Sequence, residues 1–304
     1  MAKLCLGTVQ FGMKYGVNNQ IERQPTWQES FEMIDYALEN GIDTIDTARA
    51  YGEAELVLGE YFENHPEKRS KVKVISKLRP NILEENCDVR SIVEEECKAS
   101  LKRMHLEQLN GYLLHTPEYI YNQEVLEALC ILKKQGLVEN LGVSIYDLKE
   151  GLAAVNTGIV DYIQLPYSVL DQRGSKESFF KQAKKAGITI FTRSAFLQGL
   201  FMMEYKKIPP HLEESIPYIK IFEDVRKKYQ LSRSEALLHF VKEEPDIDYL
   251  VFGVEKKEQL MEDMTSFGKK IDAKAFINEI KLKIGDVDKS IIFPSLWSNG
   301  KKAE

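Results

Sequence analysis

Short apolar runs alternate with longer amphipathic stretches along almost the whole of this chain. The short runs are rich in β-branched and aliphatic residues and are apolar throughout, as in parallel strands that are covered on both faces. Because a stretch of helical length follows each run, the pattern predicts repeated βα units with a parallel sheet. The eight predicted strands cover residues 3–8, 42–46, 72–76, 109–114, 140–143, 162–164, 188–192 and 249–252.

Two of the predicted helices begin with a strong sequence signal. Thr26 and Glu29 match a capping box, in which each side chain satisfies a free backbone N–H at the start of a helix. Residues 232–235 match a second capping box, and Gly41 is placed to end the first helix. The other helices are expected at about residues 53–64, 88–104, 123–134, 148–155, 176–186, 257–267 and 272–284, with loops at residues 9–25 and 197–212.

Eight βα units can close into a barrel or remain an open, doubly wound sheet. A (β/α)8 barrel takes about 250 residues, so 304 residues fit one barrel with additions. No change of composition and no Pro- or Ser-rich linker divides the chain, and no GxGxxG follows the first strand as a dinucleotide-binding open sheet would require. We therefore expect an α/β fold, a (β/α)8 TIM barrel with a C-terminal helix and tail, as one domain over residues 1–304.

The bulk properties exclude several classes of function. A net charge of −6 leaves no basic surface of the kind that binds nucleic acid. No stretch approaches the roughly 18 apolar residues of a membrane span, and the N-terminal apolar run is too short for a signal peptide. The cysteines lie far apart without a CxxC pair, at positions Cys5, Cys87, Cys97 and Cys130. We expect free thiols, no bound metal and a cytoplasmic protein.

Polar residues gather where the predicted strands end. They are Asp46, Lys77, His115, Ser144, Gln164 and Ser194. In a barrel the C-terminal ends of all strands face the same way and form the mouth where active sites are built. Taken singly, each residue has an ordinary structural explanation, such as a helix cap for Asp46 or a solvated ammonium for Lys77. Their joint occurrence favours an active site.

Four residues at or near these positions suit proton transfer to a carbonyl: Asp46, Tyr51, Lys77 and His115. A nearby ammonium favours the phenolate and lowers the pKa of a tyrosine, which is about 10 in the free side chain. A carboxylate beside the lysine keeps the lysine charged, and a histidine facing the same point can hydrogen-bond the substrate. Such a set can protonate the oxygen of a carbonyl while hydride reaches its carbon. No side chain donates hydride, so a nicotinamide cofactor is required.

The chain resembles the aldo-keto reductases over nearly its whole length. The motifs that carry the resemblance are LGTVQFG (6–12), GIDTIDTARAYGEAELVLG (41–59), ISKL around Lys77, YLLHTP around His115, LGVS (141–144), YIQLPYSVLDQR (162–173), RSAFLQG (193–199) and VFGVEKKEQL (251–260). The resemblance implies a (β/α)8 barrel and an NAD(P)H-dependent oxidoreductase that reduces an aldehyde or ketone to an alcohol. It implies Tyr51 as the general acid and Lys77 as the residue that lowers its pKa. Asp46 would pair with Lys77, and His115 would orient the carbonyl.

The resemblance also places the cofactor across the barrel mouth. Ser144 and Gln164 match the positions that hold the nicotinamide carboxamide, and Glu262 matches an adenine contact. Residues 194–198 match the loop around the pyrophosphate. The full set implied to bind the cofactor is Gly7, Thr8, Asp46, Ser144, Gln164, Arg193, Ser194, Phe196, Gln198, Gly253, Lys257, Gln259 and Glu262.

The chain departs from the family pattern at several of these positions. Ile145 replaces a frequent asparagine, which removes one expected carboxamide contact, and Arg193 replaces the aromatic residue that usually stacks on the nicotinamide. The positions that usually bind the 2′-phosphate of NADP(H) with Lys, Ser and Arg are Gly253, Val254 and Gln259. Lys256 and Lys257 are close enough to substitute. Family frequency favours NADP(H), with NAD(H) as the alternative.

Two other functions are compatible with parts of this pattern. A barrel lyase could use Lys77 to form a Schiff base, although that leaves the cofactor-binding motifs unexplained. A cofactor-binding redox sensor or regulatory subunit with slow turnover would retain all of them. The expected partner is a small carbonyl compound, either an aldehyde, a ketone or a sugar-like ligand, chosen by loops 9–23 and 197–212 and the tail with Trp297. We expect a monomer or a weak homo-oligomer.

Overall fold

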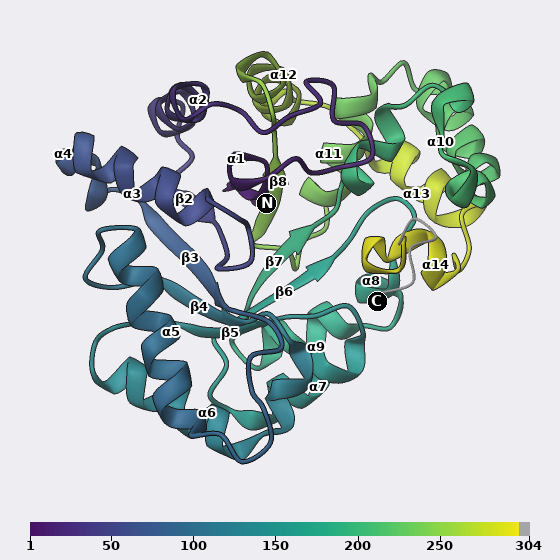
Figure 1. The fold of residues 1–304 in the computed structure, drawn as a ribbon. Coiled ribbons are helices and arrows are strands. Elements are labelled where there is room, and N and C mark those ends of the chain that lie inside the picture. Colours follow the sequence, from purple (N-terminus) through teal and green to yellow (C-terminus); the bar gives the residue numbers. More distant parts are fainter. Residues whose placement is uncertain (298–304) are drawn as a thin grey trace.

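The computed structural model describes residues 1–297, and these form a closed parallel barrel whose strands follow one another in sequence order (Figure 1). The strands are β1 (Lys3–Gly7), β2 (Thr44–Asp46), β3 (Lys73–Leu78), β4 (Gly111–Leu114), β5 (Leu141–Ser144), β6 (Tyr162–Pro166), β7 (Thr189–Arg193) and β8 (Tyr249–Gly253). In β1, Leu6 lies opposite Ile45 of β2 on one side and Phe252 of β8 on the other, which closes the sheet. The predicted (β/α)8 barrel is confirmed, and each strand agrees with its predicted bounds to within two residues.

Helices cover the outside of the barrel, with α2 and α12 side by side (Figure 1). The main helices are α2 (Trp27–Glu39), α3 (Ala54–Asn64), α5 (Val89–Arg103), α6 (Gln123–Lys134), α7 (Leu148–Thr157), α9 (Phe179–Lys185), α10 (Ile216–Lys228), α11 (Arg233–Lys242), α12 (Lys257–Gly268) and α13 (Lys274–Lys283). Both predicted capping boxes are present: Thr26 and Glu29 bond reciprocally at the start of α2, as do Ser232 and Glu235 at the start of α11.

Four predicted segments differ from the structure. The loop expected at residues 197–212 contains the short 3-10 helices η2 (Leu197–Met202), η3 (Tyr205–Lys207) and η4 (Pro210–Ser215). The single helix expected at residues 176–186 is instead α8 (Arg173–Lys176) followed by α9, because Ser178 adopts a left-handed backbone conformation with φ 59°. The loop expected at residues 9–25 contains a short helix, α1 (Val9–Gly12), and the tail contains α14 (Lys289–Ile292). Single helical turns of this kind have too few residues to show a 3.6-residue period.

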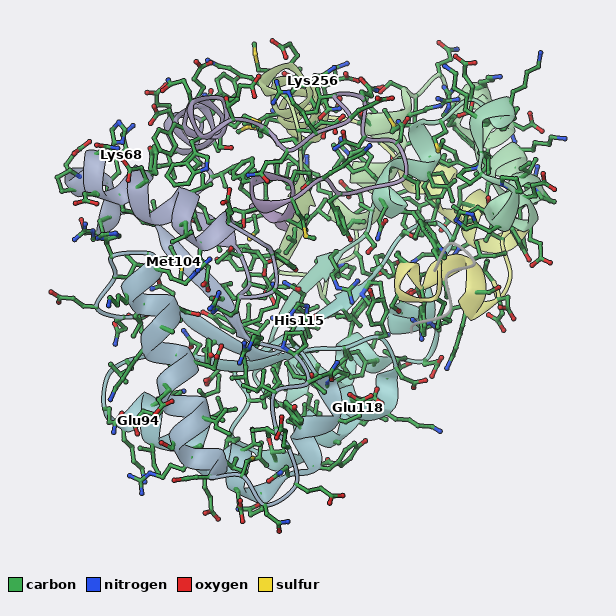
Figure 2. The ribbon with its side chains drawn as sticks, in the orientation of Figure 1. Lys68, Glu94, Met104, His115, Glu118 and Lys256 are labelled. Carbon is green, nitrogen blue, oxygen red and sulfur yellow. The ribbon has the colours of Figure 1, made fainter. Side chains whose placement is uncertain are left out.

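A layer of apolar side chains fills the inside of the barrel. It consists of Cys5, Ile75, Leu113, Phe191 and Val251. Residues two apart on a strand face the same side of a sheet, so the next inward position lies one layer nearer the mouth. Lys77 follows Ile75 in this way, as His115 follows Leu113 and Arg193 follows Phe191. Figure 2 shows His115 near the middle of the ring of strands. The alternation of side chains along these strands therefore places polar groups directly above the apolar layer.

Two further observations bear on the expectations from composition. All four cysteines are free, and Cys5 and Cys97 are buried. Within residues 1–297, no helix combines the length and the apolar character that a membrane crossing requires.

Candidate active site

The four predicted catalytic residues come together at the barrel mouth. Asp46 ends β2, Lys77 lies near the end of β3, Tyr51 lies in the loop before α3, and His115 follows β4. The Nζ atom of Lys77 lies 2.8 Å from both carboxylate oxygens of Asp46 and 3.3 Å from the hydroxyl oxygen of Tyr51. The rings of Tyr51 and His115 meet edge to face, with centroids 5.8 Å apart.

Lys77 and Asp46 form a buried ion pair. Lys77 has 0% and Asp46 2% of its surface exposed. Nζ also donates to the backbone carbonyl of Thr47 over 2.9 Å, so each of its three protons has an acceptor nearby. Burial opposes the charge of Lys77, but Asp46 and Tyr51 outweigh it, so the pKa of Lys77 is raised. A lysine whose charged form is favoured by an ion pair with Asp46 is a poor nucleophile, which disfavours the Schiff-base lyase.

The environment of Tyr51 contains opposing influences on its pKa. Burial is the largest and raises the pKa, while the ammonium of Lys77 is the next largest and lowers it. The net result is a raised pKa for Tyr51. The expected effect of Lys77 is therefore present, but desolvation of the phenol exceeds it, which sequence reasoning did not anticipate.

His115 is held in the neutral form. Burial, followed by the charges of Lys77 and Arg193, lowers its pKa to about 3. Its Nδ1 atom is buried and has no hydrogen-bond partner among residues 1–297. A neutral imidazole can donate one hydrogen bond without releasing a proton, which suits a residue that orients a carbonyl oxygen next to Tyr51.

Two glycines hold the Tyr51 loop against the start of the chain. A Cβ atom on Gly12 would lie 1.7 Å from the carbonyl oxygen of Tyr51 and 2.5 Å from the nitrogen of Ala54. Gly52 has φ +55°, and its Cβ would lie 2.2 Å from the Gly12 oxygen. On the outer side, Arg103 of α5 donates to the carbonyl of Gly52 over 3.2 Å. The backbones touch directly, so the position of the phenol is set by main-chain contact.

We expect Gly12→Ala to displace this loop and to lower the turnover number by about a hundredfold, because misplacing a reacting group by about 1 Å has that effect. Gly268→Ala is the matched control, since no atom lies within 4 Å of the added Cβ. Steady-state kinetics and thermal unfolding of both variants measure the effect. A Gly12→Ala protein with native kinetics would mean that main-chain contact does not set the Tyr51 position.

The predicted carboxamide residues lie beside the ion pair. The amide nitrogen of Gln164 donates to Asp46 over 2.7 Å, and Ser144 Oγ donates to Gln164 Oε1 over 3.5 Å. Both residues are buried. Gln164 is thus oriented by the same carboxylate that binds Lys77, which links the candidate cofactor contacts to the candidate catalytic group.

Arg193 occupies the mouth in place of an aromatic residue. Its guanidinium stacks on the ring of Tyr146, with 4.2 Å between the central carbon and the ring centroid. It also donates to the backbone carbonyl of Ile145 over 3.2 Å. No carboxylate within the described part of the chain forms an ion pair with it. The guanidinium therefore provides a positive charge at the mouth, which can bind an anionic or carbonyl group of a ligand.

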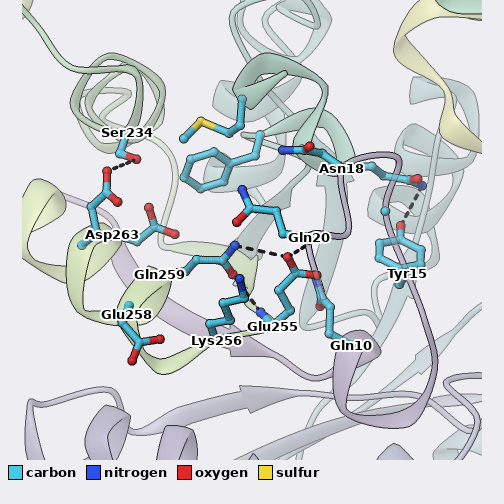
Figure 3. A pocket seen from close by; sticks show the side chains of 16 residues that line it. Gln10, Tyr15, Asn18, Gln20, Ser234, Glu255, Lys256, Glu258, Gln259 and Asp263 are labelled. Carbon is cyan, nitrogen blue, oxygen red and sulfur yellow. Dashed lines mark hydrogen bonds between the residues drawn. The ribbon is translucent and has the colours of Figure 1, made fainter. Parts of the chain in front are cut away.

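Two adjoining cavities extend from the tetrad. The inner one, of about 110 Å³, is lined by Gly7, Thr8, Asp46, Tyr51, Arg193, Ser194, Phe196, Gln198 and Gly253, among others. The outer one, of about 500 Å³, shares Gln10, Tyr15, Phe196 and Gln198 with it and continues to Gln259 and Glu262 (Figure 3). Of the predicted cofactor residues, Ser144, Gln164 and Lys257 line neither cavity. The ammonium of Lys257 lies 6.0 Å from the ring centroid of Tyr36.

The lining of these cavities includes a polar group that no residue of the described chain satisfies. Gln10 Oε1 is buried without a hydrogen-bond partner among the described residues, and a Cβ at Gly253 would lie 2.3 Å from it. A glycine there leaves room for a polar side chain that is ready for a ligand. No cluster of three or more metal-ligating side chains occurs in residues 1–297.

Sequence reasoning missed several residues that line the outer cavity: Gln10, Asn18, Gln20, Glu255 and Asp263. Gln10 lies in the single turn α1, Asn18, Gln20 and Glu255 lie in loops, and Asp263 lies on the second turn of α12. No hydrophobic period marks these positions as buried. Burial raises the pKa of Asp263 to about 7. Only 8% of Asp263 is exposed, and neither its position nor its residue type predicts that from sequence.

Asp263→Asn should stabilise the protein at pH 8 and not at pH 4. Between about pH 4 and pH 7 the unfolded chain releases the Asp263 proton while the folded chain retains it, so folding stability falls as pH rises through this window. A neutral asparagine escapes this loss, which is on the order of 4 kcal/mol for a pKa raised from 3.8 to about 7. Urea unfolding at both pH values measures it, with Glu258→Gln, exposed on the same helix, as control. An equal gain in the free energy of unfolding at both pH values would contradict the raised pKa of Asp263.

A closed (β/α)8 barrel with ionisable side chains gathered at the C-terminal ends of its strands belongs to the class of barrel enzymes. The model of the Aldo/keto reductase family matches residues 3–281. The chain therefore belongs to the aldo/keto reductase family, a family of oxidoreductases that act on carbonyl groups with nicotinamide cofactors, and the resemblance seen in the sequence motifs is confirmed.

Three relatives are similar to this chain at low identity, and each match covers most of both proteins. Over 255 residues the chain is 26% identical to the aldo-keto reductase YhdN of Bacillus subtilis, covering 76% of each protein. It is 24% identical over 301 residues to a protein of Escherichia coli named NADH-specific methylglyoxal reductase, covering 88% of this chain and 90% of that one. The holo form of aldo-keto reductase AKR11C1 from Bacillus halodurans superimposes with a TM-score of 0.74 at 18% identity, covering 95% and 94% of the two chains. That likeness shows the fold.

Proposed function

We propose that this barrel reduces an aldehyde or ketone to an alcohol, with Tyr51 as the general acid. The observation that carries the proposal is the phenol of Tyr51 in contact with a buried, charged Lys77, whose Nζ lies 3.3 Å from the hydroxyl oxygen. A bound nicotinamide, NADPH or NADH, would supply the hydride to the carbonyl carbon. Tyr51 would give its proton to the carbonyl oxygen, leaving a phenolate that the adjacent ammonium stabilises.

The other residues of the site would position the reactants. His115, neutral and without a partner at Nδ1, would hydrogen-bond the carbonyl oxygen. Asp46 would hold Lys77, while Ser144 and Gln164 would bind the carboxamide. We assign Gly7, Thr8, Arg193, Ser194, Phe196, Gln198 and Gly253 to the inner part of the cofactor, and Gln259 and Glu262 to its adenosine. Lys257 has no support from the cavities.

The test is oxidation of the reduced nucleotide in the presence of carbonyl compounds, followed by the loss of its near-ultraviolet absorbance. A panel of aromatic and aliphatic aldehydes, dicarbonyls and aldoses covers the classes that the aromatic mouth accommodates. We expect saturable turnover with at least one class. If no compound oxidises the bound nucleotide even in a single turnover, the protein is a nucleotide-binding sensor and not a reductase.

A further inference from the structure

The outer cavity is strongly acidic. Among residues 1–297, the side chains that line it and are charged at neutral pH are the carboxylates of Glu255, Glu258 and Glu262 and the ammonium of Lys256. Asp263 also lines it, with a pKa raised by burial to about 7. Figure 3 shows Glu255, Glu258 and Asp263 among the side chains around the cavity, with Lys256 near Glu255. No arginine lines this cavity within the described part of the chain. A ligand that carries a 2′-phosphate at this end would meet these carboxylates and a single ammonium, that of Lys256.

Glu255 is the most firmly held of these carboxylates. Only 6% of its surface is exposed. Its Oε1 atom accepts from the backbone nitrogen of Gln20 over 2.7 Å and from Nε2 of Gln259 over 3.4 Å. Gln259 Oε1 in turn accepts from the backbone nitrogen of Glu255 over 3.0 Å. The second oxygen, Oε2, accepts no hydrogen bond within residues 1–297, and Glu255 is one of the residues that line the outer cavity.

The cations that would bind a 2′-phosphate are absent from the expected positions. Gly253 makes room for Gln10, and Gln259 holds Glu255 in place. Lys257 points toward Tyr36 and away from the cavity. Lys256 remains, but it begins α12 at the rim and has no carboxylate or hydroxyl partner that fixes it among the described residues. The local sequence therefore presents a buried hydrogen-bond acceptor where a phosphate needs a donor.

We propose that this cavity binds the adenosine half of NAD(H) and rejects the 2′-phosphate of NADP(H), with Glu255 accepting hydrogen bonds from the ribose hydroxyls. The inference rests on the proposed nicotinamide-dependent function and replaces the expectation of NADP(H), which rested on family frequency. A carboxylate that accepts from the ribose 2′-hydroxyl selects NAD in other dinucleotide folds, and a like charge in its place is strongly unfavourable.

The test measures binding, independently of turnover. Fluorescence titration of the protein with NADH, NADPH, 5′-AMP and 2′,5′-ADP gives four dissociation constants. We expect NADH to bind at least about tenfold more tightly than NADPH, and 5′-AMP more tightly than 2′,5′-ADP by a similar ratio. Equal or tighter binding of the 2′-phosphorylated member of either pair overturns the inference.

Variants assign the selectivity to Glu255. Glu255→Gln keeps the shape and removes the charge, so NADPH should bind about tenfold more tightly and NADH severalfold more weakly than to the native protein. Glu255→Lys should reverse the preference. Glu258→Gln removes the same charge from the exposed rim and should change the ratio by less than about threefold. An equal change of the ratio in Glu255→Gln and Glu258→Gln overturns the assignment to Glu255.

The outcomes separate this inference from the proposed function. If NADH binds selectively but no carbonyl compound oxidises it, the reductase fails and the selectivity of the cavity stands. If carbonyl reduction proceeds with NADPH bound at least as tightly as NADH, the reductase stands and the selectivity fails. If none of the four nucleotides binds, both are overturned.

Discussion

Replacing Tyr51 by phenylalanine should lower the turnover number for carbonyl reduction by at least about a thousandfold, the range of a lost general acid. The substituted phenyl ring can keep the edge-to-face contact that Tyr51 makes with His115, at a centroid distance of 5.8 Å. Lys77 keeps its bonds to Asp46 and to the carbonyl of Thr47. Stability and nucleotide affinity should therefore be unchanged, and only the proton donor is removed.

The measurement combines single-turnover oxidation of bound nucleotide with a direct binding titration. Tyr15→Phe is a suitable comparison, because Tyr15 is, like Tyr51, half-buried at the mouth, but its hydroxyl contacts Gln198, 2.9 Å away, and not Lys77. Its loss of turnover should be far smaller than that of Tyr51→Phe. Turnover retained in Tyr51→Phe would require another proton donor and would remove the basis for the proposed mechanism.

Replacing Lys77 by methionine should abolish activity and destabilise the fold by about 3–5 kcal/mol, the usual result of leaving one partner of a buried ion pair alone. Asp46 is 2% exposed, and in the variant it would keep only the amide of Gln164 as a side-chain partner. Methionine matches the length of the lysine stem, so the loss reports the charge and not a cavity. Urea unfolding at neutral pH measures the change in the free energy of unfolding.

The double variant Asp46→Asn, Lys77→Met separates stability from catalysis. Removing both charges takes away the uncompensated carboxylate, so much of the lost stability should return. Activity should not return, because the phenolate of Tyr51 would still lack its counter-charge. A Lys77→Met variant as stable as the native protein would mean that water reaches the ion pair, contrary to its burial.

The order and type of the secondary structure could be predicted from the sequence because the signals are local. The eight apolar runs, the capping boxes at Thr26 and Ser232, and the helix at residues 123–134 depend on neighbours within one or two turns. The prediction of one helix at residues 176–186 was wrong, since nothing local marks Ser178 as the residue with a positive φ. Tertiary packing selects that conformation.

The candidate tetrad could also be found in the sequence, because strand ends of a closed barrel converge whatever their separation along the chain. Asp46, Lys77 and His115 each lie at or near such an end. What could not be found was the state of these groups. Desolvation raises the pKa of Tyr51 more than Lys77 lowers it, and this balance depends on atoms from many segments.

The sequence by itself determined the barrel, its strands and the residue types at its mouth, since periodicity and chain order carry that information. Only the tertiary structure decided the contact between Gly12 and the Tyr51 loop and the direction in which Lys257 points. It also decided that Glu255 is buried and lines the outer cavity. Burial and charge are sums over all neighbours in space, and residues from 10–20, 196–202 and 255–263 become neighbours only when the chain has folded.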